Sequence, residues 1–487
     1  MEDLKGKTIR GGLARILAQG TNFILRFVTL MILARLLDPD DFGLVGMVTA
    51  FTGALSLFRD FGLSSAAIQR ATITEEQVTT LFWINLLVGV VLGIVALAMA
   101  PAIAALYHEP RLVGVTAALA LGFVFNSAGA QHGSLLQREL RFTALAVINT
   151  VSLIAAGGVA IFAAKIGVGY WALVAMALVI PLSASIGSWV VSGWIPGMPH
   201  RRSGIHSMMR FGGILTMNSL VVYLSNNVDK VLVGWYWGVD ALGIYGRAYQ
   251  LVSIPIENLN SAAGEIAFPA LCRIQDDAAR LKSYFLKGYS LLLAITVPIT
   301  ITCALCADDL ISVLLGPKWI AAVPTFRFLA PTILAFAIVN PMGWFIYSLG
   351  MAGRGLKMAL VIAPVMVAGF MFGLPFGPQG VAFGYSAVML LWIIPAIAWA
   401  VHGTILSVGE VLVTVSRPLA AGFVSSALAF GVGLASVQLV PLTRLVIQTS
   451  ALLITYAVLL VFATGQKSLY LDILRGFKYQ RNGKKRA

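Results

Sequence analysis

The sequence predicts an all-α, polytopic membrane protein with about fourteen transmembrane helices. Of its 487 residues, 59% are hydrophobic and 11% are charged, and the mean hydropathy is +0.89. Soluble globular domains average about 45–50% apolar and about 25% charged residues. Apolar runs of about 20 residues, the length with which a helix crosses the hydrocarbon core, recur along the whole chain. Because lipid offers no hydrogen bonds to the backbone, such runs are expected to be helices.

Fourteen apolar runs are long enough to cross a membrane. They span residues 11–36, 42–69, 81–106, 112–136, 144–165, 168–192, 209–236, 241–270, 284–306, 322–348, 357–374, 379–401, 417–439 and 443–464. The first run carries Arg15 and Arg26 and has no small-residue cleavage site. It is therefore expected to remain as a helix and not to be a cleaved signal peptide.

The distribution of Lys and Arg predicts which loops face the cytoplasm, because short basic loops stay on that side. Basic residues gather near the amino terminus, in every second loop and in the tail 466–487. The alternate loops contain fewer of them: Arg35, Arg111, Lys165, Lys318 and Arg444. We therefore expect both termini to be cytoplasmic. This asymmetry accounts for most of the net charge of +14, so the tail is expected to face lipid headgroups and not nucleic acid.

A repeat at an offset of 200 residues relates the first two predicted spans to the seventh and eighth. DDFGLVG from Asp40 aligns with DALGIYG from Asp240, which matches Gly43 with Gly243. Six spans separate the copies, so both have the same orientation, as in the parallel repeats of transporters. Two lobes of six helices are therefore predicted. The predicted boundaries are an N-lobe at 1–196, a cytoplasmic linker at 197–210, a C-lobe at 211–402, two extra helices at 403–465 and a basic cytoplasmic tail at 466–487.

Polar residues within the predicted spans concentrate in these repeated hairpins. The first span carries polar residues at helical spacing, which share one face: Gln19, Asn22 and Arg26. The second span carries a polar stripe: Thr49, Thr52, Ser56 and Arg59, with Asp60 about 100° around the helix. The seventh and eighth spans carry a larger set: Asn218, Asn226, Asp229, Lys230, Arg247, Gln250 and Glu257.

Charged residues lie deep within the predicted spans: Arg26, Arg59, Asp60, Asp229, Lys230, Arg247 and Glu257. A charge that faces lipid at mid-bilayer costs at least about 2.5–3.5 kcal/mol. The summed cost, on the order of 20 kcal/mol, exceeds the whole stability of a typical fold. These side chains are therefore expected to face water, one another or a ligand. They either pair between helices, for instance Asp229 with Arg247, or line a hydrated cavity between the lobes.

The deep cations outnumber the deep acids, which favours an anionic ligand. Arg suits phosphate, because its fixed donors match two phosphate oxygens at once. Five segments, in the order of the chain, then resemble the signature segments of one protein family. They are FRDFGLSSAAIQR (58–70), QHGSLLQRELRF (131–142), GVGYWALV (167–174), DKVLVGWYWGVDALGIYGRAYQL (229–251) and LLGPKW (314–319).

In these segments the chain resembles Wzx-type polysaccharide flippases of the multidrug/oligosaccharidyl-lipid/polysaccharide (MOP) exporter superfamily. The likeness is greatest to the subgroup that exports colanic-acid-like exopolysaccharides and succinoglycan, and it covers about residues 5–400. It implies two six-helix lobes in the V arrangement of MATE-like transporters, plus two extra carboxyl-terminal helices. The first, second, seventh and eighth helices would line a central cavity.

The resemblance also implies a function. Such a flippase moves an undecaprenyl-pyrophosphate-linked oligosaccharide repeat unit from the inner to the outer leaflet by alternating access, for exopolysaccharide or lipopolysaccharide biosynthesis. The implied partners are this polyprenyl-linked oligosaccharide, membrane lipid, and a polysaccharide polymerase with its export machinery. No cofactor is expected beyond a coupling proton or cation.

The deep polar residues receive hypothetical roles on this basis. The cations would bind the pyrophosphate: Arg26, Arg59, Lys230 and Arg247. The neutral residues would bind sugar hydroxyls: Gln19, Asn22, Asn218, Asn226 and Gln250. The acids would couple transport to protons or balance charge: Asp60, Asp229 and Glu257. An acid in a low-dielectric cavity holds its proton more tightly, so Glu257 or Asp60 would be protonated in one state of the cycle.

Two other functions of the same superfamily remain open, a multidrug/cation antiporter and a lipid II flippase. An antiporter for cations needs an acidic, aromatic cavity, whereas a lipid II flippase needs the same cationic one. An enzyme is not expected, because the longest outer loop, Ala307–Ala321, is short and the five His are dispersed and mostly near loops. In that loop, Asp308 and Asp309 are predicted to be solvated at a helix end. Cys303 and Cys306 are predicted to be packing residues, so no metal site is expected.

Overall fold

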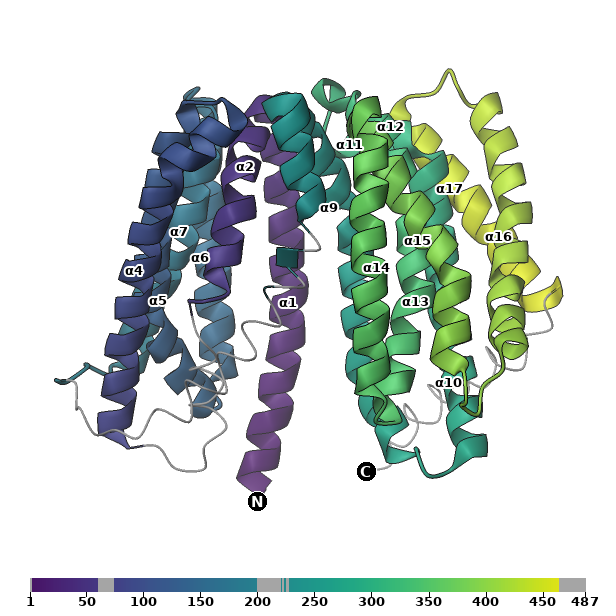
Figure 1. The fold of residues 1–487 in the computed structure, drawn as a ribbon, viewed down its shortest axis with the longest axis horizontal. Helices are drawn as coiled ribbons and strands as arrows, with labels where there is room; N and C mark the ends of the chain where they lie inside the picture. Colours follow the sequence, from purple (N-terminus) through teal and green to yellow (C-terminus); the bar gives the residue numbers. More distant parts are fainter. Residues whose placement is uncertain (1, 60–73, 199–219, 221–222, 225–226, 464–487) are drawn as a thin grey trace. The chain divides into compact units, whose positions relative to one another are not determined.

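The computed structural model describes residues 2–59, 74–198, 220, 223–224 and 227–463, and the side chains of these residues apart from 2–18, 262 and 463. Helices dominate these ranges, which contain no β-strand (Figure 1). The chain divides into two compact units, Met1–Gly246 and Arg247–Ala487. Helix α9 (Val228–Arg273) contributes its first part to one unit and the rest to the other.

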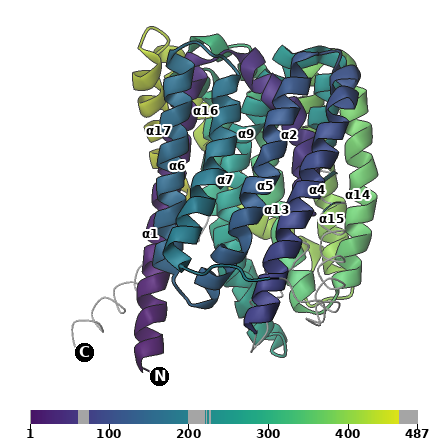
Figure 2. The ribbon, with the colours of Figure 1, turned by 90° about the vertical axis from the view of Figure 1, so that its left-hand side faces the viewer.

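The first unit is a series of long helices that pack through small residues. It contains α1 (Glu2–Leu36), α2 (Pro39–Ser56), α4 (Glu75–Tyr107), α5 (Arg111–Arg138), α6 (Phe142–Lys165) and α7 (Trp171–Ser192). Helix α4 packs on α5, α5 on α7, α7 on α6 and α6 on α1 (Figure 2). At the α5–α7 contact, a Cβ on Gly129 would lie 2.7 Å from the Cα of Ser185. Membrane helices approach this closely where small residues line the contact.

The turn between α1 and α2 has the sequence of a helix start. The backbone N–H of Asp38 donates to Asp41 Oδ2 at 3.1 Å, and Pro39 occupies the first turn of α2, where proline is favoured. The corresponding residue of the second repeat copy is Gly238, where α9 is interrupted with φ 83° and ψ −166°. Glycine adopts this positive φ without strain. The chain therefore changes direction at the same position in both copies, as the predicted boundary between the seventh and eighth spans requires.

The two repeat copies cross at glycines. A Cβ on Gly43 would lie 1.9 Å from the carbonyl oxygen of Val239, and a Cβ on Gly243 would lie 2.0 Å from that of Pro39. Positions 39 and 43 precede 239 and 243 by the same 200 residues, so the repeat exchanges the two contacts. Such reciprocity is the mark of a two-fold axis, at which a patch contacts its own copy. The predicted repeat thus has a structural counterpart, which we call the glycine crossing.

The repeat also places two aspartates, Asp40 and Asp240, beside the glycine crossing. The pKa of Asp240 is raised above its ordinary value, first by desolvation and then by the negative charge of Asp40. Arg111 Nη2 lies 3.4 Å from Asp40 Oδ2. Because its pKa is raised, Asp240 binds a proton more tightly in the folded chain than in the unfolded chain. The stability contributed by this proton is complete below the ordinary Asp pKa of about 3.9 and is lost as the pH rises through the raised value.

The variant Asp240→Asn is therefore expected to lose less stability than the wild-type protein between about pH 4 and about pH 7. The difference will be small, because Asp240 is exposed and its charge is screened by solvent. Thermal unfolding of the detergent-solubilised protein at the two pH values measures it. Asp276→Asn, an exposed change in the turn that follows α9, is the control. Equal pH responses of Asp240→Asn and the wild type would contradict the prediction.

The second unit surrounds an apolar core. Its helices are the rest of α9, α10 (Ala278–Leu305), α11 (Ala307–Leu314), α12 (Ala322–Leu329), α13 (Pro331–Ser348), α14 (Ala352–Gly373), α15 (Gly377–Val401), α16 (Val408–Ala435) and α17 (Pro441–Val458). Short 3₁₀ turns lie at Pro317–Trp319 and Leu374–Phe376, and a π-helical turn at Leu459–Ala463. The core joins α10, α13, α15 and α16, and includes the buried side chains of Phe285, Phe345 and Val411.

The segment 307–321, predicted to be a loop, is largely helical, so this prediction was wrong. Helix α11 occupies its first half, and a 3₁₀ turn that buries Trp319 follows. Ile311 and Leu315 lie four residues apart and are both fully buried. Apolar residues at that spacing occupy one helical face, which explains why this short segment forms a helix with a buried side.

Glycines also set the contact between α14 and α15. A Cβ on Gly384 would lie 2.3 Å from the carbonyl oxygen of Gly369, and a Cβ on Gly373 would lie 2.2 Å from that of Gly380. The two backbones therefore touch at two successive levels of the hairpin. In a membrane, where the hydrophobic effect does not drive helices together, this close approach provides the packing energy.

Nine stretches of the described residues are long and apolar enough to cross a membrane, and one of them contains both α14 and α15. The predicted range 209–236 lies mostly outside the described residues. Elsewhere, one or two helices cover most of the described part of each predicted range. Helix α16 begins at Val408, before the predicted start at 417, because Ser407 and Glu410 cap its first turn. The molecule is thus a multi-pass, all-α membrane protein.

Candidate functional site

On the predicted polar face of α1, one residue packs against a neighbouring helix and two are exposed. Asn22 Oδ1 accepts a hydrogen bond from Thr150 Oγ1 of α6 at 2.9 Å. Gln19 and Arg26 are exposed. Within the described part of the chain, no hydrogen bond or ion pair joins the Arg26 guanidinium to another residue. Asn22 therefore helps to hold α1 against α6, and its amide N–H groups form no hydrogen bond with another described residue.

The predicted polar stripe on α2 is satisfied within the helix itself. Thr49 donates to Gly46 O at 3.1 Å, Thr52 to Val48 O at 3.1 Å and Ser56 to Gly53 O at 2.6 Å. Hydroxyls that bond to their own helix in this way need no ligand. Arg59 is half-buried and follows the last turn of α2. Asp60 lies outside the described residues, as do Asn218 and Asn226.

The first part of α9 holds a buried acid beside a cation. Asp229 is 2% exposed, and Tyr245 Oη donates to its Oδ2 at 2.7 Å. Lys230 Nζ lies 3.9 Å from Asp229 Oδ1 and donates to Asn227 Oδ1 at 3.0 Å. Asn227 in turn donates from Nδ2 to Tyr223 O at 2.9 Å. The carboxylate of Asp229 therefore lies beside the ammonium group of Lys230, and a tyrosine hydroxyl orients the carboxylate.

The second unit holds the remaining predicted site residues, all on α9. The Arg247 guanidinium donates to Gln250 Oε1, so this amide oxygen is bound by its own helix neighbour. Glu257 is exposed, two turns further along the helix. Gln250 therefore accepts from Arg247 through its oxygen, and its amide N–H groups form no hydrogen bond with another described residue.

Sequence reasoning missed several residues of these clusters. Tyr245, which binds Asp229, lies in the segment 229–251 but carries no charge, so the pattern of buried charges gives no signal for it. Asn227 lies three residues before Lys230, a spacing at which helical side chains meet, and this signal was available. Thr150 is paired with a residue 128 positions away. No local pattern could have found that pair.

A tyrosine connects the segment before α9 to α2. Tyr223 Oη lies 3.2 Å from both the Thr49 and the Ala50 carbonyl oxygens, to which it donates. A Cβ on Gly53 would lie 2.0 Å from the same hydroxyl. Gly53 therefore provides the space that this side chain occupies against α2.

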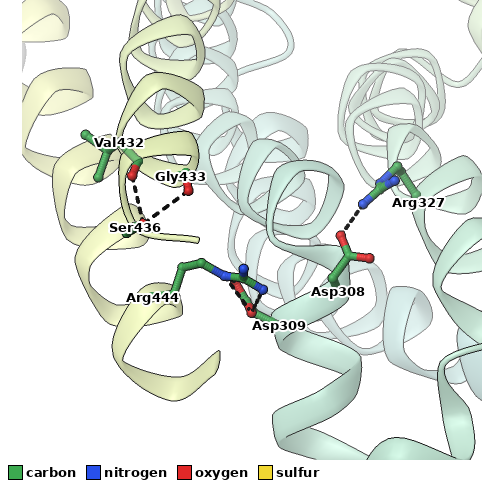
Figure 3. Close-up of polar contacts among 7 residues, drawn as sticks. All are labelled: Asp308, Asp309, Arg327, Val432, Gly433, Ser436 and Arg444. Carbon is green, nitrogen blue, oxygen red and sulfur yellow. Dashed lines mark hydrogen bonds and ion pairs between the residues drawn. The ribbon is translucent and has the colours of Figure 1, made fainter. Parts of the chain in front are cut away.

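Two aspartates at the start of α11 have separate arginine partners (Figure 3). Asp308 pairs with Arg327, and both side chains are about half exposed. Arg444 of α17 binds Asp309 through two nitrogens, with Nε 2.7 Å from Oδ2, and the Asp309 side chain is only 4% exposed. The prediction that both acids are solvated is therefore wrong for Asp309. Its bond holds α17 to α11 in the second unit.

His132 is fully buried within α5. Its ring lies 4.2 Å, centroid to centroid, from that of Trp189 of α7. Its Nδ1 forms a 2.9 Å hydrogen bond with Ser192 Oγ. This histidine therefore contributes to the packing of α5 against α7.

Comparisons with known proteins establish the fold. An inward-closed structure of the lipid II flippase MurJ matches 95% of this chain and 100% of its own, with a TM-score of 0.74 and 12% identity. An inward-facing structure of a multidrug resistance MATE transporter of the MOP superfamily matches 80% of this chain and 97% of its own, with a TM-score of 0.60 and 15% identity. The predicted all-α, MATE-like transporter fold is confirmed.

Sequence comparison gives the family. The lipopolysaccharide biosynthesis protein WzxC of Escherichia coli (strain K12) is 26% identical over 398 residues, which are 80% of each chain. The profile of the family described as "Polysaccharide biosynthesis protein" matches residues 32–324, more than half of this chain. The matched range includes α2, the glycine crossing and all five segments in which the sequence resembles that family. The chain therefore belongs to this family of polysaccharide biosynthesis proteins.

Proposed function

We propose that this protein is a flippase that translocates undecaprenyl-pyrophosphate-linked oligosaccharide units across the bacterial inner membrane, for the synthesis of an exopolysaccharide or lipopolysaccharide. Membership of a family of polysaccharide biosynthesis proteins and the fold of membrane transporters support a transporter and not an enzyme. The observation that carries the choice of an anionic lipid is Arg26. Its guanidinium is exposed within a predicted span and has no partner among the described residues.

The pyrophosphate is bound chiefly by Arg26 in this proposal. A charge held in a membrane span without a protein partner costs several kcal/mol unless water or a ligand faces it. A guanidinium recovers this cost when it donates two hydrogen bonds to phosphate oxygens. Lys230 lies beside the carboxylate of Asp229, so it supplies a weaker attraction than Arg26. Arg59 and Arg247 are the further candidates.

The sugar units are bound by neutral groups. The amide N–H groups of Asn22 and Gln250 are the donors that their described contacts leave available, since the oxygen of each accepts from Thr150 or Arg247. Gln19 is exposed one turn from Asn22 on the same helix. Amide groups suit sugar hydroxyls because they donate and accept without adding charge. In the proposed cycle the polyprenyl chain stays in lipid while the headgroup crosses.

The proposal places both termini in the cytoplasm and keeps Glu257 and Asp60 as candidates for proton coupling. A polysaccharide polymerase and export machinery are the proposed partners. The name of MurJ describes a lipid II flippase, but a likeness at 12% identity supports the fold alone. The family described for polysaccharide biosynthesis favours the oligosaccharide substrate over a multidrug substrate.

The variant Arg26→Gln tests the function. Hydrogen bonds to a charged group contribute about 1.5–3 kcal/mol, so the rate of flipping at subsaturating substrate is expected to fall by about 10- to 150-fold. Arg26→Lys should retain part of the rate because it keeps the charge. The measurement uses proteoliposomes that contain the undecaprenyl-pyrophosphate-linked oligosaccharide, whose arrival in the other leaflet exposes it to an impermeant glycosidase.

Arg280→Gln is the matched control, since it removes an exposed guanidinium near the start of α10. It should flip at the wild-type rate. In cells, deletion of the protein is expected to stop the polymer and to accumulate lipid-linked repeat units. Normal polymer together with increased drug sensitivity would show that the protein is a drug transporter instead.

A further inference from the structure

The glycine crossing admits no side chain at its centre. The groups that face Gly43 and Gly243 are the backbone carbonyls of Val239 and Pro39, at 1.9 and 2.0 Å from an added Cβ. A backbone carbonyl in a helix cannot rotate aside as a side chain can. The crossing therefore brings two backbones into direct contact, which closes any space between them to water and to a ligand.

The contact continues along α2. One turn below the crossing, a Cβ on Gly46 would lie 3.6 Å from Leu242 Cδ2. Two turns further, the Tyr223 hydroxyl contacts Gly53 and the carbonyls of Thr49 and Ala50. Gly43 and Gly53 are ten positions apart, which corresponds to about 15 Å along a helix at 1.5 Å per residue. That length is about half of the hydrocarbon core, which is about 30 Å thick.

The interactions across this contact are weak enough to separate and re-form. The described contacts across it are van der Waals contacts between small groups and the hydrogen bonds of one hydroxyl. The Tyr223 hydroxyl donates to helix carbonyls, and water can replace it at little cost. The chain turns at Asp38 in one copy and at Gly238 in the other, so each copy has a bend next to its contact residue.

We infer that the glycine crossing is a gate, in which Gly43 and Gly243 form the backbone seal and Tyr223 closes its inner end. The inference rests on the proposed function, because a flippase must close and open each side of its path in turn. The gate lies where α1 ends and α2 begins, at the end of α1 away from the amino terminus, which is predicted to be cytoplasmic. It separates when the headgroup leaves toward that side.

A cysteine pair tests the gate. Gly46→Cys with Leu242→Cys, in a protein whose Cys272, Cys303 and Cys306 are replaced by serine, places two thiols across the contact. Oxidation should form the disulfide and reduce flipping at least tenfold, and a reductant should restore it. The control pair Gly93→Cys with Val124→Cys joins α4 and α5, where a Cβ on Gly93 would lie 3.9 Å from Val124 Cγ2. Oxidation of that pair should leave flipping unchanged.

A second measurement needs no substrate. Gly43→Ala places a methyl group against the Val239 carbonyl and should reduce the yield of the 46–242 disulfide at least fivefold. Gly246→Ala is the matched control, because nothing lies within 4 Å of a Cβ at that position. Its disulfide yield should equal that of the parent pair.

These results separate two failures. The gate is disproved if the protein with an oxidised 46–242 pair flips as fast as the same protein after treatment with a reductant. It is also disproved if Gly43→Ala leaves the disulfide yield unchanged. If the Cys-replaced and wild-type proteins both fail to flip the lipid-linked oligosaccharide while the disulfide yields follow the expectation, the gate stands and the proposed substrate is wrong.

Discussion

Replacement of Arg444 by methionine is expected to destabilise the protein by about 3–5 kcal/mol. Arg444 donates to Asp309 through two nitrogens, and the Asp309 side chain is 4% exposed. Without the guanidinium, a carboxylate remains buried with no opposite charge, and water cannot reach it. Because the pair joins α11 to α17, the loss should appear as earlier unfolding of the second unit. Denaturation of the detergent-solubilised protein, followed by circular dichroism, measures the loss.

The neighbouring pair supplies the control. Asp308 and Arg327 also form an ion pair, but their side chains are 60% and 48% exposed. Exposed pairs contribute about 0–1 kcal/mol, so Arg327→Met should change stability little. The double variant Asp309→Asn with Arg444→Met removes the buried charge as well and should recover part of the loss. Equal effects of Arg444→Met and Arg327→Met would show that burial does not decide the strength of the pair.

The variant Tyr245→Phe is expected to destabilise the first unit by about 1.5–3 kcal/mol. Tyr245 is fully buried, and its hydroxyl donates to Asp229, which is 2% exposed. A hydrogen bond to a charged group contributes in this range, about twice as much as one between neutral groups. Lys230 cannot replace the donor without moving, since its Nζ lies 3.9 Å from the other carboxylate oxygen. Thermal unfolding with a probe in the first unit measures the change.

Tyr289→Phe is the matched comparison, because that buried hydroxyl donates to a neutral group, Ile338 O, at 3.0 Å. Its loss should be about 0.5–1.5 kcal/mol. Adding Asp229→Asn to Tyr245→Phe removes the buried charge and should restore part of the stability. If the double variant is less stable than Tyr245→Phe alone, the hydroxyl does not serve the carboxylate.

The transmembrane helices were predictable because their signal is local. A run such as 81–106 is apolar throughout, and α4 extends beyond it at both ends, to Glu75 and Tyr107. The repeat was predictable for a similar reason, since the segments from Asp40 and Asp240 share glycines at the same spacing. The reciprocal contact of those glycines was not predictable, because the similarity of the two copies does not say how far apart they lie in space.

The site was less predictable than the fold. A residue's chemistry can be read from the sequence, but its partner often lies far along the chain, as Arg444 does from Asp309. Polarity alone also overestimates the number of site residues. Thr52 and Ser56 matched the predicted stripe on α2, yet each bonds to its own helix. Charge proved more informative, because a helix cannot satisfy a guanidinium such as that of Arg26 from its own backbone.

The backbone contact at Gly43 and Gly243 has a genetic consequence. Where two side chains collide, a smaller residue on the opposite helix can relieve a larger one, and second-site revertants appear at the facing position. Here the opposing atom is a peptide oxygen that every amino acid carries. A defect caused by Gly43→Ala should therefore have no suppressor at position 239, and revertants should arise only at codon 43 itself or at residues that shift a whole helix.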